Sequence, residues 1–200
     1  MKIGEAQQIY REQVKAYQEQ KSALSKRLKT VQSRMESTQN DEDKALFSKD
    51  AATLELSIKE LDEKQKEYQD YLSELTDQYC AYWNATVAKQ QADAAKEYGE
   101  EMGKIMDIAR RIMKGGTVPQ SDEKKLMDFS YELYQAAKTM GEMVKRQKEK
   151  NEEYDTLWGD KEKKEYDDPQ EVAENATAAS NGPELVSPED TLAGVFVAEE

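Results

Sequence analysis

The sequence predicts an all-α protein in which antiparallel coiled-coil hairpins share a long central helix, with a disordered acidic tail after them. Three observations support this fold class. The 200 residues include only 9 Gly and 4 Pro, and 36% of them are charged, a composition typical of long polar helices. Apolar residues recur at alternating spacings of three and four, as coiled-coil seams require. The net charge of −13 is concentrated toward the C-terminus.

The first predicted helix covers residues 4–37. Its apolar residues fall on one alternating series that only Gln7 and Lys21 interrupt, and a series of this length indicates one helix of a coiled coil. Its members are Ile3, Tyr10, Val14, Tyr17, Leu24, Leu28, Val31 and Met35.

A second series follows the turn-like run at residues 37–41 and predicts a helix from residue 44. Two helices joined by so short a loop pack antiparallel. A reversal near residue 41 sets Leu28 against Leu54 and Lys21 close to Leu61, so Lys21 must extend past the seam to keep its ammonium group in water. The series comprises Phe47, Ala51, Leu54, Ile58, Leu61, Gln65, Tyr68, Leu72, Leu75, Tyr79 and Tyr82.

The central helix meets no proline before Pro119, and Gly115 supplies a left-handed C-cap after residue 114. The strict heptad decays in its second part, however, and Gly99 weakens a helix. We therefore expect a stutter, bend or break between Asn84 and Gly103, with helices over about 44–98 and 100–114. A straight continuation gives an elongated rod of two hairpins, and a reversal near Gly99 gives a compact three- or four-helix bundle. The sequence leaves both arrangements open.

The last helix is predicted over residues 121–158, which completes a helical domain over residues 1–158. Ser121 is its expected N-cap, and acidic residues follow in the first turn, where they interact favourably with the helix dipole. The helix is expected to stop at Gly159. Its seam consists of Leu126, Leu133, Ala137, Met140 and Val144, widened by Phe129, Tyr134 and Met143.

Residues 159–200 are expected to be a disordered acidic tail. From residue 151 onward the chain has 15 acidic and 3 basic residues, a balance of −12, and three of the four prolines lie past residue 160. A segment of this composition buries too little apolar surface to offset its conformational entropy. An apolar segment at 191–197 lies near its end. This segment either has no role or is a docking peptide that adds a strand or inserts into a groove.

No catalytic, cofactor or metal site is predicted. The sequence has no histidine and a single cysteine, Cys80, which excludes zinc sites of the usual nitrogen and sulfur kind and every Ser-His or Cys-His nucleophile pair. Residues 99–105 resemble a phosphate-binding loop, but the run is one residue short and has Ile where the magnesium-binding Ser or Thr belongs. We therefore expect no enzyme activity. Cys80 follows a seam position and is expected to be buried.

Proteins are the expected partners. Residues 1–150 contain 27 acidic and 26 basic residues, without the basic excess that nucleic-acid binding requires. The longest uncharged stretch, residues 78–88, has 11 residues, whereas a membrane-spanning helix needs about 20. No membrane span is therefore predicted. A lone cysteine and a start without an apolar signal segment favour a cytoplasmic location.

The candidate partner-binding residues fall into three groups. An uncharged aromatic patch on the central helix is expected to meet Ile3 and the end of the last helix. Methionines gather in the second hairpin, where they suit either an adaptable binding surface or a loosely specified core. The tail supplies the third group. The candidates are Tyr79, Tyr82, Trp83 and Trp158; Met102, Met106, Met140 and Met143; and Leu192, Val195 and Phe196.

The expected function is that of a non-catalytic helical scaffold or adaptor that acts through protein–protein contacts. Tyr10, Tyr17 and Tyr68 are expected to be half covered in a two-helix hairpin, and a homo-oligomer would cover them. The alternative function is a cytoplasmic chaperone for an exported or secreted helical protein, which rests on analogy. A structural component of a phage or mobile-element particle is the third.

Overall fold

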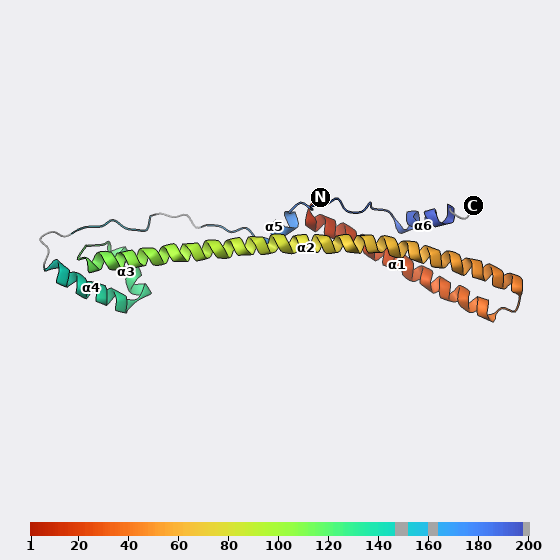
Figure 1. Ribbon diagram of the computed structural model, residues 1–200, viewed down its shortest axis with the longest axis horizontal. Coiled ribbons are helices and arrows are strands. Elements are labelled where there is room, and N and C mark those ends of the chain that lie inside the picture. The colour runs from red at the N-terminus through yellow and green to blue at the C-terminus, as the bar shows by residue number, and fades with distance from the viewer. Residues whose placement is uncertain (147–151, 160–163, 198–200) are drawn as a thin grey trace. The chain divides into compact units, whose positions relative to one another are not determined.

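The computed structural model is all-α, as predicted. It describes residues 1–146, 152–159 and 164–197, with side chains up to residue 193, and within these ranges it contains two isolated β-bridges and no strand. None of the helices in this described part is long and apolar enough to cross a membrane. The chain divides into two compact units, unit 1 (Met1–Thr86 with Asp167–Glu200) and unit 2 (Val87–Tyr166). The helices are α1 (Ile3–Ser37), α2 (Asp41–Met113), α3 (Gln120–Phe129), α4 (Tyr131–Lys145), α5 (Pro169–Asn175) and α6 (Pro188–Val197) (Figure 1).

Unit 1 is built on the antiparallel hairpin of α1 and the N-terminal part of α2. The side chain of Asn40 accepts a hydrogen bond from Glu42 N at 3.1 Å, which explains why α2 begins at Asp41. The predicted register, which sets Lys21 close to Leu61, is confirmed. Lys21 pairs with Asp62, the residue after Leu61, and one turn away Gln65 Nε2 donates to Gln18 Oε1 at 3.2 Å across the hairpin. Near the connecting loop the core consists of Val31, Ala51 and Leu54, packed by Leu24, Leu28 and Phe47.

Lys21 interrupts the seam as expected, and the structure shows how its charge is accommodated. Its side chain is 20% exposed, and its Nζ forms an ion pair with Asp62. The same Nζ donates to Gln65 Oε1 at 3.0 Å. The ammonium group thus reaches the edge of the hairpin, where it has both partners and access to water.

The helix boundary predicted near Gly99 is wrong, because α2 is one helix from Asp41 to Met113. A glycine in a helix interior costs about 1 kcal/mol relative to alanine, and without a nearby proline or cap this cost does not end a helix. The predicted C-cap is confirmed. Gly115 has φ of 81°, and its N–H donates to Ile112 O at 2.9 Å.

Unit 2 packs α3 and α4 against the C-terminal part of α2 around an aliphatic core. Ile108, Leu126 and Ala137 are completely buried there. Gly141 of α4 lies so close to the carbonyl oxygen of Ile112 that a Cβ atom at this position would overlap it. The absence of a side chain at Gly141 is therefore what allows α4 to approach α2 this closely.

The single helix predicted over residues 121–158 is wrong. Its N-cap is not Ser121, since α3 already begins at Gln120, and the helix stops at Ser130, whose backbone is extended (φ −157°, ψ 108°). The Oγ of Ser130 accepts a hydrogen bond from Leu133 N at 3.2 Å and caps α4. Because of the break, α3 and α4 can each direct an apolar residue into the same core. The stability gained from this packing depends on tertiary contacts, so helix propensity along the sequence does not predict the break.

Residues 152–158 are not helical either. Thr117 N donates to Glu152 O at 2.8 Å, and Tyr154 N donates to Thr117 O at 2.9 Å, so this segment runs beside the loop that follows α2. Asp122 is completely buried and accepts hydrogen bonds from Thr156 Oγ1 at 2.7 Å and from Leu157 N at 3.1 Å. Residues 147–151 of the predicted helix lie outside the described residues.

The prediction of a disordered tail over residues 159–200 is wrong for the described residues from 167 onward. Residues 169–192 include α5 and the start of α6 and pack on the hairpin of unit 1 (Figure 1). Ala173 and Leu192 are buried. Composition failed here because a few apolar residues and many paired backbone groups stabilise the segment, and net charge measures neither of these. Residues 160–163 and 198–200 lie outside the described part of the chain.

Candidate functional site

Four buried tyrosines form a row on the hairpin of unit 1, which we call the tyrosine row. α1 contributes Tyr10 and Tyr17, which are two helical turns apart, and α2 contributes Tyr68 and Tyr71. The rings of Tyr10 and Tyr71 lie 4.8 Å apart at 69°, and those of Tyr17 and Tyr68 lie 5.4 Å apart at 81°. Aromatic pairs prefer such edge-to-face contacts. The row therefore spans both helices as one packed surface.

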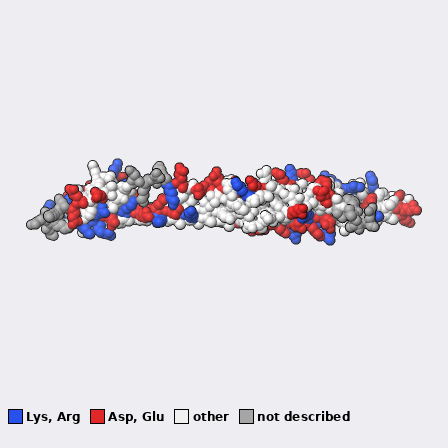
Figure 2. Space-filling model, turned by 90° about the horizontal axis from the view of Figure 1, so that it is seen from above, with Lys and Arg blue, Asp and Glu red and all other residues white. Residues whose placement is uncertain are grey.

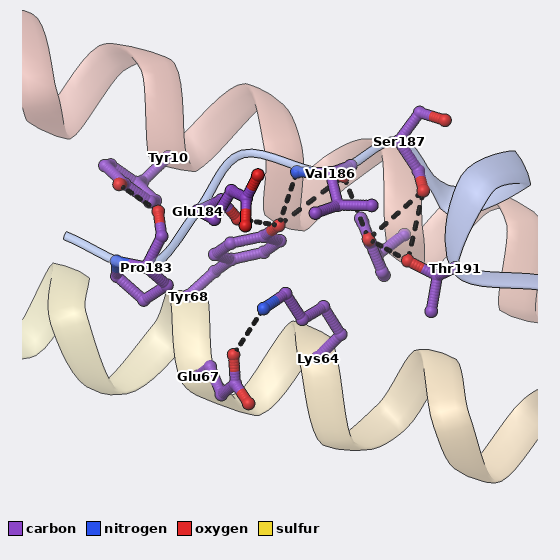
Figure 3. A network of polar contacts seen from close by, with 10 residues as sticks. Tyr10, Lys64, Glu67, Tyr68, Pro183, Glu184, Val186, Ser187 and Thr191 are labelled. Atoms are coloured by element: carbon purple, nitrogen blue, oxygen red, sulfur yellow. Dashed lines mark hydrogen bonds and ion pairs between the residues drawn. The ribbon is translucent and has the colours of Figure 1, made fainter. Parts of the chain in front are cut away.

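Each hydroxyl group of the tyrosine row donates a hydrogen bond to a backbone carbonyl of the same extended segment. Figure 3 shows Tyr10 and Tyr68 directed at this segment, and Tyr68 Oη also accepts a hydrogen bond from Val186 N at 3.0 Å. Carbonyl groups occur in every sequence, so these contacts recognise an extended backbone. The acceptors are Ser180 O, 2.9 Å from Tyr71 Oη; Pro183 O, 2.6 Å from Tyr10 Oη; Glu184 O, 2.9 Å from Tyr68 Oη; and Val186 O, 2.9 Å from Tyr17 Oη.

The bound segment belongs to residues 176–192, which we call the strap. Its first residues pair with the start of the chain, where Ile3 N donates to Ala176 O at 2.9 Å and Ala178 N donates to Met1 O at 3.0 Å. Ala179 N donates to Gln78 Oε1 at 2.9 Å. Backbone groups of the strap thus find partners on α2 and at the start of the chain, which offsets the cost of removing them from water.

The end of the strap is anchored by an apolar residue. Leu192 is 8% exposed and belongs to the same core cluster as the tyrosine row. Thr191 Oγ1 lies 2.6 Å from Tyr17 Oη. Ser187 Oγ accepts a hydrogen bond from Asp190 N at 3.0 Å and so caps the helix that presents these residues. Of the three predicted docking residues in the tail, Leu192 therefore packs on this chain's own hairpin, and the side chains of Val195 and Phe196 lie outside the described residues.

Burial favours the protonated form of the two tyrosine hydroxyl groups that α1 contributes to the row. It raises the pKa of Tyr17 to about 12, and it also raises the pKa of Tyr10 above the usual 10.0. Both groups therefore remain hydrogen-bond donors at neutral pH.

The predicted aromatic patch lies only partly in this core. Tyr79 packs against the cluster that contains Ile3, as expected, and its ring centroid is 6.1 Å from that of Trp83. Tyr82 and Trp83 are exposed. Cys80 is exposed too, so the prediction of a buried thiol is wrong, because its position one residue beyond Tyr79 turns it away from the seam.

Unit 2 contains the remaining predicted residues. Met140 is 53% exposed and Met143 is 63% exposed, Met106 is also exposed, and Met102 is half-buried. Trp158 packs against the core of unit 2, donates from Nε1 to Glu101 Oε1 at 2.6 Å and has Lys125 Nζ 3.8 Å from its ring centroid. These contacts give Trp158 a structural role within the unit.

Acidic and basic side chains are mixed over the face drawn in Figure 2. Within the described residues, no three acidic or cysteine side chains gather in a way that could bind a metal ion. No protein-family model, curated protein or solved structure matches the chain.

The sequence predicts that Tyr10, Tyr17 and Tyr68 are half covered and that a second copy of the chain covers them. The structure corrects this, because they are buried and the strap of the same chain binds their hydroxyl groups. Tyr71 was missed because it lies outside the heptad series. The available signal was the hydroxyl group itself, since a buried tyrosine usually requires a hydrogen-bond partner and a leucine does not.

Proposed function

We propose that the protein is a non-catalytic adaptor that acts through protein–protein contacts, and that the tyrosine row binds an extended segment of a partner. The supporting observation is the set of hydrogen bonds from the row to four backbone carbonyls within residues 180–186. Each bond of this kind contributes about 0.5–1.5 kcal/mol net. Together they supply affinity for a backbone and leave specificity to a few side chains.

Proline-containing segments suit such a surface. An extended proline-rich backbone has no internal hydrogen bonds, so its carbonyl groups are free to accept bonds from the tyrosine hydroxyls. Because proline restricts the chain before binding, less conformational entropy is lost on docking. Aromatic rings beside these hydroxyls add apolar contact area.

A peptide selection tests this proposal. Random peptides displayed on phage are selected against the full chain carrying Leu192→Asp, which weakens the anchor of the strap. They are then compared on the same chain with Tyr17→Phe and Tyr68→Phe added. We expect extended peptides that lose binding when the two hydroxyl groups are removed. Peptides that bind both chains equally would contradict the proposal.

Exposed methionines in unit 2 favour a second candidate function, a chaperone for an exported or secreted helical protein. Met140 and Met143 are one helical turn apart on α4 and both exposed. Methionine side chains adapt to different apolar partners. Under this hypothesis the double substitution Met140→Glu and Met143→Glu releases a helical client, whereas Tyr17→Phe does not. The opposite pattern would support the adaptor.

A further inference from the structure

We infer that the strap is a built-in competitor, which occupies the tyrosine row until a partner segment of the same chemistry displaces it. The inference rests on the proposed function and adds the sequence of the partner and a means of regulation. The partner segment is an extended peptide with a Gly-Pro step at the centre of the row. An aliphatic residue follows ten positions after the glycine, as Leu192 follows Gly182.

The glycine is required by the close approach of the strap to the row. A Cβ atom built on Gly182 would overlap the hydroxyl oxygen of Tyr10 and a ring carbon of Tyr71. Any other residue there must push two buried rings aside or lift the strap. The row therefore selects glycine by shape.

The proline that follows is suited to the same place. Pro183 presents its carbonyl to Tyr10 Oη at 2.6 Å, and it has no N–H group that would require a partner. Its fixed φ lowers the entropy lost when the segment docks. Pro188, at the start of α6, is buried.

The aliphatic anchor completes the motif. Leu192 is buried in the core cluster that contains the tyrosine row, and the short helix that carries it follows the capping residue Ser187. A partner that ends before this anchor keeps the hydrogen bonds of the extended part but loses the apolar burial.

The strap is suited to displacement because few of its side chains are buried. Ala179, Ser180, Asn181, Glu184 and Leu185 are all exposed, and binding depends on backbone hydrogen bonds and on the two ends of the strap. Its advantage over a free peptide is covalent attachment, which gives an effective concentration of about 1 mM for flexible linkers. A partner at micromolar concentration must therefore bind more tightly than the strap or arrive after the strap has been weakened.

The test uses the full chain and a fluorescent peptide with the natural sequence of residues 172–193. Gly182→Val in the chain releases the strap, and Asn181→Val is the matched control because Asn181 is the exposed neighbour. By fluorescence anisotropy, we expect the peptide to bind the Gly182→Val chain at least about tenfold more tightly than the wild-type or Asn181→Val chain. A peptide that itself carries Gly182→Val is expected to lose this binding.

The outcomes separate the inference from the proposed function. Equal affinity for the wild-type and Gly182→Val chains overturns competition by the strap and leaves the adaptor proposal intact. Failure of the peptide to bind either chain overturns both. Circular dichroism verifies that the helices are retained. If Gly182→Val lowers helix content, the same comparison is made with Leu192→Asp, which releases the strap at its other end.

Discussion

The two units close their cores in different ways. Unit 2 uses aliphatic residues such as Ile108 and Leu126, and Gly141 brings α4 directly onto α2. In unit 1 the tyrosine row forms part of the buried core of a two-helix hairpin. Its hydroxyl groups require hydrogen-bond acceptors, and these lie outside the two helices. The strap supplies them. The aliphatic side chains of unit 2 require no hydrogen-bond acceptors, whereas the buried hydroxyl groups of the tyrosine row require a peptide backbone that accepts their hydrogen bonds.

The largest effect is expected in the aliphatic core. Leu126→Ala removes a completely buried side chain of unit 2, and we expect it to lower the free energy of unfolding by about 2–5 kcal/mol. Met127→Ala, one residue away and exposed, should change it by about 0.5 kcal/mol or less. Chemical denaturation measures both. Similar losses for the two variants would mean that unit 2 lacks the core described.

A smaller effect is expected from the row. Tyr17→Phe keeps the ring but removes the donor to Val186 O, so unit 1 should lose about 1 kcal/mol and the strap should exchange its amide protons faster. The control is Tyr82→Phe, which removes the same atom from an exposed side chain. Hydrogen exchange compares the two. If neither variant changes the amide exchange rates of the strap, the hydrogen bonds from the row do not stabilise the docked strap.

The sequence predicts features that depend on neighbouring residues and fails on features that depend on residues far apart in the chain. The hairpin register and the C-cap at Gly115 follow from local patterns, and both were confirmed. The break at Ser130 and the docking of the strap depend on contacts between residues far apart in the chain. Tyr17 and Val186 are 169 positions apart, and neither periodicity nor composition registers such a pair. The acidic composition of the tail predicts disorder, although the burial of a single residue, Leu192, helps to hold the strap on the hairpin.

The polar residue in the seam of unit 1 gives a still smaller effect. Lys21→Met adds an apolar side chain to the seam, but it removes the ion pair with the exposed Asp62 and the hydrogen bond to Oε1 of the buried Gln65. These effects oppose one another, so we expect the free energy of unfolding of unit 1 to change by about 1 kcal/mol or less. Lys26→Met, on the exposed face of α1, should change nothing measurable. Urea midpoints compare the variants. A loss well above about 1 kcal/mol for Lys21→Met would contradict this expectation and show that the polar contacts of Lys21 stabilise the hairpin.

No effect of pH through Tyr17 is expected in the neutral range. Since burial raises the pKa of Tyr17 from 10.0 to about 12, the stability it contributes is complete below pH 10.0 and is lost as the pH rises toward 12. Tyrosinate absorbance and circular dichroism followed together from neutral to alkaline pH measure this. Release of the strap near neutral pH would contradict the assignment of protonated donors.

Native-state hydrogen exchange of the strap tests the central claim most directly. Ala178, Ala179 and Val186 each donate an amide hydrogen bond to the hairpin or to the start of the chain. In the wild-type protein we expect these amides to exchange at least about tenfold more slowly than in a free peptide of the same sequence. Exchange at the rate of the free peptide would contradict the account, since the tyrosine row would then have no bound backbone.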